Sequence, residues 1–499
     1  MLPKTSGPIP NNVLPPRLSN RVLQLCGFVL IWVFSAHASA GELDLDDSVL
    51  RESKMYELSG ADESYSFVEQ QIYRGEAGSA LNRLNTEIEQ IELIRHRYHE
   101  DLIVPLTLAG DALMVQREFD KALDNYERAR HIARVSTGLF AESQLPVVYR
   151  EADAFRRIGD LGSTAKREEY AYEIAKKAFG DYTLETLDSL YRLADFYLET
   201  YNYLSARSLY NRALGIIESH QLGNAPEAIT ALRGIAVSHR LARFPPFYVH
   251  SANDNSRFEG PRPGLTVSDL EDQHIAFNNF PAGEKALQRI VEIQRKNTPE
   301  DSEALAQAIT ALGDWHLMFG RSNAANVLYK HVATEVDATT QLPASSDADA
   351  PADPAGPMVP DTPTVSETQL PSRFADPTLI YFPVPNDPSV PKTATPDQGQ
   401  KGFVKLGFDV GTTGKIRKLK TLEAYPPKLM EFRVRRSIRQ AVFRPRLENG
   451  VAVVAGNQSY THYFTFYPNP EDYIETEAAS SSPEESPPPS TAEPEDDPV

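Results

Sequence analysis

Residues 106–129 read LTLAGDALMVQREFDKALDNYERA, and residues 190–213 read LYRLADFYLETYNYLSARSLYNRA. The two stretches align without a gap, with small or aromatic residues at the same places. Small residues let two antiparallel helices approach, and aromatic residues fill the space between them. The shared positions are Leu106/Leu190, Gly110/Ala194, Leu113/Tyr197, Phe119/Tyr203, Ala122/Ala206, Tyr126/Tyr210 and Ala129/Ala213. The offset from 106 to 190 is 84 residues, two periods of 42, which predicts a region of repeated helix pairs.

Further copies of the pattern extend this region. A weaker copy lies around Ala152 and Ala165, and a fifth unit, ITALGDWHLMFGRSNAANVLYKHV, occupies 309–332. The spacing resembles the tetratricopeptide repeat (TPR), although the period of 42 is longer than the usual length of about 34 residues. The resemblance implies an all-α, TPR-like solenoid over 60–335 that holds protein partners in its groove.

One repeat is interrupted. The stretch LRGIAVSHRLARF (232–244) reads as a helix whose partner is displaced to EKALQRIVEIQ (284–294). The intervening residues 245–282 then form an insertion. Loops of that length inside a solenoid are usually functional or disordered, and the role of this one stays open.

The N-terminus has the features of an export signal. Arg17 and Arg21 precede the apolar run VLQLCGFVLIWVF (22–34), and a small-residue stretch ends at Ala40. A basic flank, a short apolar run and small residues describe a secretory signal peptide over 1–40, so we expect a periplasmic protein. The alternative is an uncleaved N-terminal segment that anchors the chain in the inner membrane. The single cysteine, Cys26, lies in this run, so no disulfide can form within the chain.

Two segments lack the periodicity of helices or strands. Residues 338–376 are rich in Pro, Asp, Ser and Thr, and residues 468–499 form a tail with ten acidic residues from Glu471 onward and no basic one. Such compositions bury too little apolar surface to offset the entropy of ordering, so we predict a disordered linker and a disordered tail. A second folded domain, 377–467, lies between them.

This second domain has the pattern of a small α+β module. In GFVKLGFDVGTTGKIRKLKTLE (402–423), apolar and polar residues alternate on both sides of a glycine turn, which predicts a β-hairpin. A helix is predicted over 426–442, because its apolar residues fall on one stripe, and YTHYFTFY (460–467) alternates as a third strand. The order is β-β-α-β.

The module resembles the C-terminal domain of the TonB family of energy transducers. The matching pieces are G-x-V-x-x-x-F-x-V (402–410), the turn at Gly414, the apolar and basic helix, and F-R-P (443–445) followed by Asn449 and Gly450. The family's Tyr-Pro-x-x-Ala helix is not evident before the first strand. Its long membrane anchor is also missing or replaced by the signal peptide. The resemblance implies binding to an outer-membrane receptor by addition of a strand to a sheet edge, for which 460–467 is the candidate.

Basic residues gather in this module, in contrast to the net charge of −19 of the whole chain. Residues 401–467 contain thirteen Lys and Arg against four Asp and Glu. The patch is suited to an acidic receptor segment, lipid headgroups, peptidoglycan or the chain's own tail, or it is a solvated surface. The predicted binding residues are Lys415, Arg417, Lys418, Lys420, Arg433, Arg436, Arg439, Tyr460, Tyr463 and Phe464.

The stretch DVGTTGKIRK (409–418) is not a nucleotide-binding loop. Asp409 stands where the phosphate loop needs its first glycine, and Ile416 stands where the loop needs a hydroxyl for magnesium. No catalytic residue, cofactor site or metal site is predicted, and we expect no enzymatic activity.

These patterns together predict a cell-envelope adaptor with a TPR solenoid and a TonB-like module on a flexible linker. One alternative is a TPR scaffold whose TonB-like domain is only structural or self-associating. Another is an energy transducer to outer-membrane receptors, if the N-terminus is an uncleaved anchor. Nucleic acid is not an expected partner, because the protein is acidic and carries an export signal. The partner's identity and the oligomeric state stay open.

Overall fold

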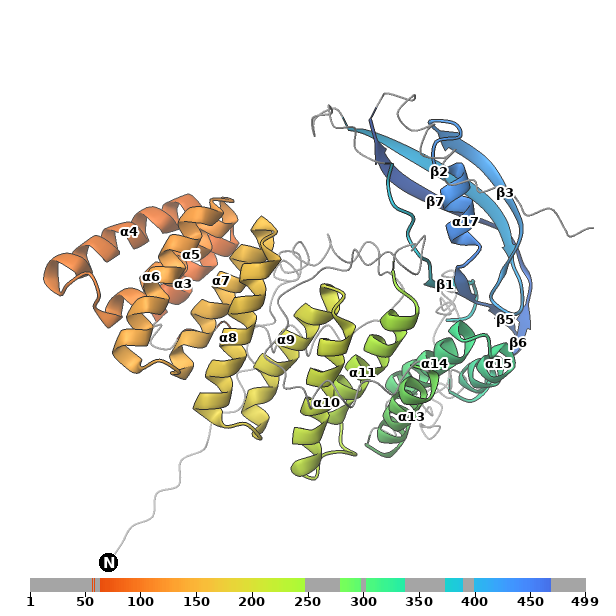
Figure 1. Ribbon diagram of the computed structural model, residues 1–499, viewed down its shortest axis with the longest axis horizontal. Helices are drawn as coiled ribbons and strands as arrows, with labels where there is room; N and C mark the ends of the chain where they lie inside the picture. Colours follow the sequence, from red (N-terminus) through yellow and green to blue (C-terminus); the bar gives the residue numbers. More distant parts are fainter. Residues whose placement is uncertain are drawn as a thin grey trace, which may run out of the picture. The chain divides into compact units, whose positions relative to one another are not determined.

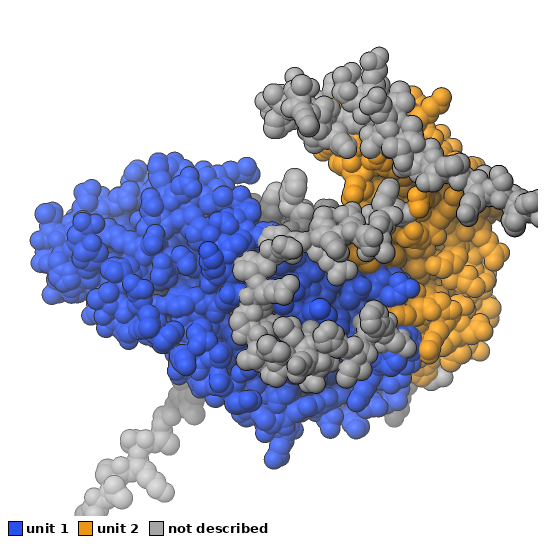
Figure 2. Space-filling view, viewed as in Figure 1, with its two compact units in different colours: residues 1–244, 251–315 blue, residues 245–250, 316–499 orange. Residues whose placement is uncertain are grey.

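The computed structural model describes residues 56, 58, 63–246, 279–297, 302–336, 373–388 and 399–467 (Figure 1). The chain divides into two compact units, marked in Figure 2. Unit 1 contains residues 1–244 and 251–315, and unit 2 contains 245–250 and 316–499. The division falls inside helix α14 (Ser302–Met318).

Unit 1 is a row of antiparallel helix pairs with a constant period. Helices α5, α7 and α9 begin at residues 103, 145 and 187, 42 residues apart, and their partners α6, α8 and α10 begin at 119, 161 and 203. The bounds are α3 (Glu63–Tyr73), α4 (Ala77–Ile94), α5 (Ile103–Val115), α6 (Phe119–Thr137), α7 (Leu145–Ile158), α8 (Leu161–Phe179), α9 (Leu187–Glu199) and α10 (Tyr203–Ser219). The helical repeat predicted from the aligned stretches is confirmed.

The residues that align between repeats pack between helices, as their sizes predict. Ala122, Ala129 and Ala213 are fully buried where helices cross, and Tyr126 and Tyr210 lie beside them, almost fully buried. A Cβ atom built on Gly110 would come within 2.3 Å of the Tyr126 ring, so only glycine allows this approach. Close helix packing therefore depends on small residues at fixed positions in each repeat.

The interrupted repeat forms as predicted. Helix α11 (Ala228–Arg243) packs against α13 (Asn279–Asn297), although their sequences are far apart. The Trp315 indole of α14 donates a hydrogen bond to the Phe280 carbonyl at 3.2 Å, which ties α14 to α13. Most of the insertion predicted over 245–282 lies outside the described residues.

Unit 2 contains a small sheet module. A three-stranded antiparallel sheet has the order β3-β2-β7, formed by β2 (Gln400–Val410), β3 (Ile416–Tyr425) and β7 (Ala455–Phe466). Two short ladders accompany it, made of β1 (Thr378–Tyr381) with β4 (Val442–Arg444) and β5 (Arg446–Glu448) with β6 (Val451–Val453). The predicted hairpin is confirmed, whereas the β-β-α-β order omitted these four short strands.

Two predicted boundaries in the module were wrong. The helix expected over 426–442 is α17 (Glu431–Ile438), because Lys428 has a positive φ of 70°, which is not helical. The third strand, expected to begin at 460, begins at 455. The predicted apolar face of the helix is still the buried one, and Val434 and Ile438 pack with Val404 and Leu406 in the core of the module.

The module shares its unit with the last helices. Tyr329 of α15 (Ser322–His331) is fully buried, and its ring centre lies 5.6 Å from that of Phe374, which is 1% exposed. The Leu447 amide donates to the Phe374 carbonyl at 3.0 Å, which links this residue to β5. Phe374 therefore belongs to the folded unit, and the linker predicted to extend to 376 ends before it. Helix α15, which the prediction assigned to the solenoid, lies in the same compact unit as the module and packs with β6.

Several predicted segments lie outside the described residues. These are the signal peptide (1–40), residues 338–372 of the linker and the acidic tail (468–499). Within the part of the chain that the structure covers, no helix combines the length and the apolar character that crossing a membrane requires.

Candidate functional site

An aspartate recurs on the first helix of three consecutive pairs. Asp111 on α5, Asp153 on α7 and Asp195 on α9 occupy equivalent positions, 42 residues apart. Arginines recur with the same period at 150 and 192. The Arg150 Nε atom donates to both carboxylate oxygens of Asp111 at 2.9 Å, and Arg192 donates to Asp153 at 2.6 Å. Each arginine thus joins its own repeat to the preceding one.

Arg192 also contacts a second carboxylate. Its Nε atom lies 2.9 Å and 3.1 Å from the oxygens of Glu168 on α8, whose side chain is 1% exposed. Burial raises the pKa of Glu168 despite this contact. Burial would also raise the pKa of Asp153, but the charges of Arg192 and Arg156 and the hydrogen bonds from Tyr56 and Arg192 together outweigh that effect, and the pKa of Asp153 is lowered. Asp153 is therefore an ionised hydrogen-bond acceptor at neutral pH.

Each repeated aspartate also accepts a hydrogen bond from a tyrosine hydroxyl. In two repeats the tyrosine comes from the second helix of the same pair: Tyr126 donates to Asp111 at 2.7 Å, and Tyr210 donates to Asp195. The equivalent residue of the middle pair is Glu168, which has no hydroxyl. Asp153 instead accepts from Tyr56, which lies before α3, the first helix that the structure describes.

Tyr56 is held on several sides. Arg192 donates to its hydroxyl oxygen at 2.6 Å, and Arg150 donates to its backbone carbonyl at 3.0 Å. The two guanidinium carbons lie 5.5 Å and 5.3 Å from the centre of its ring, within the range of cation–π attraction. The Tyr149 ring packs edge-on at 6.3 Å. Burial raises the pKa of Tyr56 well above its ordinary value, so the phenol is neutral.

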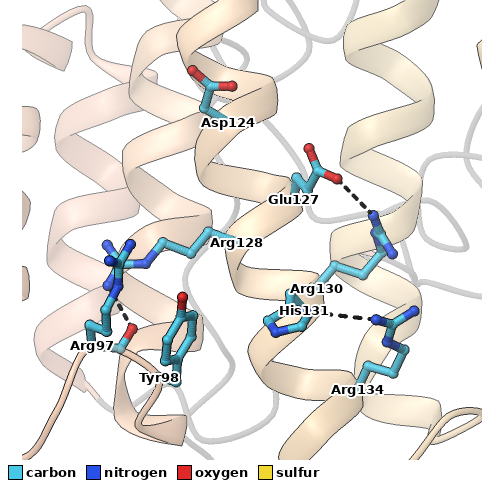
Figure 3. Close-up of a pocket in the computed structure, with 8 residues that line it drawn as sticks. All are labelled: Arg97, Tyr98, Asp124, Glu127, Arg128, Arg130, His131 and Arg134. Atoms are coloured by element: carbon cyan, nitrogen blue, oxygen red, sulfur yellow. Dashed lines mark hydrogen bonds and ion pairs between the residues drawn. The ribbon is translucent and has the colours of Figure 1, made fainter.

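A charged pocket on α6 is a second candidate (Figure 3). It is lined by Arg97, Tyr98, Asp124, Glu127, Arg128, Arg130, His131 and Arg134. Two of its arginines already form ion pairs within the protein: Arg128 pairs with Glu92, and Arg130 pairs with Glu151 at 2.9 Å. Because these guanidinium groups already have carboxylate partners, the pocket offers less to a ligand than its composition suggests.

The basic residues predicted to form one patch lie on two faces of the module. Arg417 is in register with Asp409 and Lys420 with Gly407, on the sheet face away from α17. Lys418 is bound to Asp409 at 2.9 Å on this same face, and Lys415 lies in the turn. Arg433, Arg436 and Arg439 belong to α17 and its C-cap, on the other face. The sheet therefore separates the two groups.

The three predicted aromatic residues of β7 have different environments. Tyr463 is 71% exposed and packs against Phe403, at 6.5 Å between ring centres. Tyr460 is partly buried against Phe382, and burial raises its pKa to about 12. Phe464 is 2% exposed and belongs to the core of the module. Its prediction as a binding residue was wrong, because alternate residues of β7 face the core and Phe464 is one of them.

β7 lies at the edge of the sheet, as predicted for the third strand, and β3 is the other edge. The Thr465 amide donates to the Asp387 carboxylate at 3.1 Å, not to β2, which shows that its backbone points away from the sheet. Alternation places the amide and carbonyl groups of Thr461 and Tyr463 on the same open edge.

The aspartate–arginine–tyrosine site was missed by sequence reasoning. In the alignment of the two repeats, Tyr126 matches Tyr210. The same period of 42 residues, applied to the middle repeat, would have identified Asp153 and Arg192 and shown that Glu168 replaces the tyrosine. The participation of Tyr56 had no signal in the spacing. In the described ranges no group of three or more histidine, cysteine, aspartate or glutamate side chains is arranged to hold a metal ion.

The chain is thus a helical-repeat protein with a small strand-containing C-terminal domain. No protein-family model matches the sequence, and no curated protein sequence matches it. Solved structures similar to it include BtubC (BKLC) from P. vanneervenii, with 14% identity over 59% of this chain and 99% of that one, and a TM-score of 0.35. A putative kinesin light chain from Podosopora anserina with nearly identical TPR-like repeats shows 13% identity, covers 47% of this chain and 94% of that one, and has a TM-score of 0.34.

Proposed function

We propose that this protein is a non-enzymatic adaptor of the cell envelope. The helical repeats support a role as a protein-binding scaffold, because stacked helix pairs create extended surfaces for protein or peptide partners. The N-terminal signal pattern supports export to the periplasm, as argued above. The mature chain then begins at Gly41, which N-terminal sequencing of the protein from a periplasmic fraction tests. A chain that retains residues 1–40 in the membrane fraction would instead favour the anchored alternative.

The C-terminal module provides the second contact in this proposal. The observation that carries it is the outer position of β7 in the sheet, together with the Thr465 amide, which donates to Asp387 and not to β2. By alternation, the backbone groups of Thr461 and Tyr463 point away from β2 as well. An extended peptide adds to such an edge through main-chain hydrogen bonds. The resemblance to the TonB C-terminal domain indicates a segment of an outer-membrane receptor as the ligand.

A proline substitution tests strand addition without removing a bond to β2. Thr461→Pro deletes an amide that points outward, a position where edge strands tolerate proline. Thr461→Ala is the matched control, since it keeps the amide. The full chain, immobilised in an envelope extract, should recover an outer-membrane receptor identified by mass spectrometry. Thr461→Ala should retain the receptor and Thr461→Pro should lose it. Equal recovery by both variants would reject strand addition at this edge.

The packing of the module also favours the second function, a scaffold with a structural C-terminal domain. Terminal repeats need their apolar face covered, and the module covers Tyr329 of α15 with Phe374. Gly450 of the β5–β6 turn also approaches Lys330 and Thr334, since a Cβ atom there would lie 3.1 Å and 3.0 Å from their side chains. If envelope partners bind the repeats and none depends on β7, this alternative holds.

A further inference from the structure

The middle repeat lacks the tyrosine that its neighbours have. Tyr126 and Tyr210 satisfy Asp111 and Asp195 from within their own helix pairs. At the equivalent position Glu168 turns to Arg192 and provides no hydroxyl for Asp153. The repeat is therefore built with an acceptor and a donor for a phenol that its own helices do not supply.

The geometry around Tyr56 defines the chemistry of this site. The hydroxyl donates to the Asp153 carboxylate and accepts from Arg192 at 2.6 Å, so both hydrogen-bonding functions of a neutral phenol are used. Two guanidinium groups lie near the ring, and the Tyr149 ring packs against its edge. Phenylalanine would fill the space but leave Asp153 and Arg192 without the hydroxyl. A phosphorylated tyrosine would bring its charge against the Asp153 carboxylate.

We propose that Asp153, Arg192, Arg150 and Tyr149 form a binding site for a tyrosine side chain of a partner protein, and that Tyr56 fills this site in cis until the partner displaces it. The inference rests on the proposed function, because it assumes that the repeats bind a peptide segment. It adds the residue that the repeats recognise and the segment of this chain that competes for the same place.

The position of Tyr56 in the chain supports its role as an occupant. It precedes α3 and belongs to none of the helix pairs. Leu58, two residues later, is 6% exposed in the core formed by the first helices, so the segment is held at two points. A ligand attached to its own receptor by a short tether has an effective concentration in the millimolar range. Such a cis ligand blocks weak competitors and yields to a partner that binds more tightly.

A peptide titration on the full chain tests the site. The probe is a fluorescein-labelled peptide with the sequence of residues 50–61, LRESKMYELSGA. Tyr56→Ala opens the site, so this chain should bind the peptide about tenfold or more tightly than the wild type does. A peptide with phenylalanine in place of the tyrosine should bind the Tyr56→Ala chain about tenfold more weakly. Three outcomes would overturn the proposal. The wild type and Tyr56→Ala could bind the peptide equally well, the two peptides could bind the Tyr56→Ala chain equally well, or the Tyr56→Ala chain could bind no peptide.

Matched variants separate the site from general stability. On the Tyr56→Ala background, Asp153→Asn should abolish binding of the peptide. Asp195→Asn removes the equivalent carboxylate, which Tyr210 occupies, and should leave binding unchanged. Circular dichroism checks that each chain is folded. If Tyr56→Ala unfolds, Tyr56→Phe replaces it; because its ring still fills the site without the hydroxyl, the gain in affinity over the wild type should then be smaller. The peptide titration tests the tyrosine site, and the envelope pulldown tests the adaptor function. Either proposal can therefore fail while the other holds.

Discussion

Arg192 binds two carboxylates at once, Asp153 of the preceding helix pair at 2.6 Å and Glu168 at 2.9 Å. Its side chain is 12% exposed, so the three charges are mostly shielded from water. Arg150 makes the equivalent bond to Asp111, one repeat earlier. The arginine–aspartate pair is therefore the repeated connection between neighbouring pairs of helices, in addition to apolar packing.

Removing Arg192 should destabilise the repeats strongly. Arg192→Ala leaves Glu168 buried without its main cation, and breaking a buried pair in this way costs about 3–5 kcal/mol. Urea unfolding followed by far-ultraviolet circular dichroism measures the loss. Lys121→Ala is the control, because Lys121 pairs with Glu118 at the surface, where its side chain is 70% exposed. That change should cost less than about 1 kcal/mol. Similar losses for both variants would contradict a structural role for the buried network.

Two glycine substitutions should have opposite effects. Gly110→Ala forces a Cβ atom to within 2.3 Å of the Tyr126 ring, which must move. Overpacking of this kind costs about 1–3 kcal/mol. Gly215→Ala, on α10, meets nothing within 4 Å and should stabilise the helix by about 0.5–1 kcal/mol. In thermal unfolding, the midpoint temperature of Gly110→Ala should lie below that of the wild type, and the midpoint temperature of Gly215→Ala should lie above it. A shift in the same direction for both would argue against the close approach at Gly110.

The repeats could be predicted because their signal is local and periodic. Helix pairs with small residues at crossing points recur every 42 residues, so two clear copies, 106–129 and 190–213, located the others. The alternation in 402–410 likewise predicted which face of β2 is buried, with Val404 and Leu406 inside. The helix start in 426–442 was harder to predict, because the positive φ at Lys428 has no periodic signature in the sequence.

The candidate site depends on contacts that no local pattern reports. Tyr56 and Arg192 are 136 residues apart, and only the folded chain brings them together. The basic patch was mispredicted for a related reason. Charge composition cannot tell that Arg417 and Arg436 lie on opposite sides of a sheet, which depends on the register of β3 against β2. Phe464 is buried because alternate residues of β7 face the core.

The stability of the C-terminal module should fall at mildly acidic pH because of His462. This residue is 6% exposed, and within the described residues its Nε2 atom has no hydrogen-bond partner. Burial lowers the pKa of His462, although Asp387 partly opposes the effect. In the unfolded chain His462 takes up a proton near pH 6.5, the ordinary pKa of about 6.5 for histidine. In the folded chain it does so only at lower pH. The unfolded state then binds more protons, and the free energy of unfolding decreases as pH falls through this window.

Substitution of His462 should remove that dependence. Pulse proteolysis in urea at about pH 7.5 and about pH 5.5 compares the wild type with His462→Gln, which does not titrate in this range. The wild-type module should lose more stability between the two conditions than the variant does. His331, at the end of α15 in the same unit, provides the control through His331→Gln. An equal loss in the wild type and in His462→Gln would show that other groups carry the pH dependence.

The module should need Phe374 to fold. Its ring is 1% exposed against Tyr329, and its carbonyl accepts the Leu447 amide at 3.0 Å. Phe374→Ala leaves a cavity and should cost about 3–5 kcal/mol, measured by the urea concentration at which protease cleaves the module. A fragment of residues 377–467 lacks both Phe374 and α15, so it should be cleaved rapidly, whereas a fragment of residues 316–467 contains both and should resist. Phe432→Ala, at a residue that is 59% exposed, serves as the control and should change resistance little. If the 377–467 fragment resists protease as well as 316–467 does, the module folds without α15, and its packing against Tyr329 contributes little to its stability.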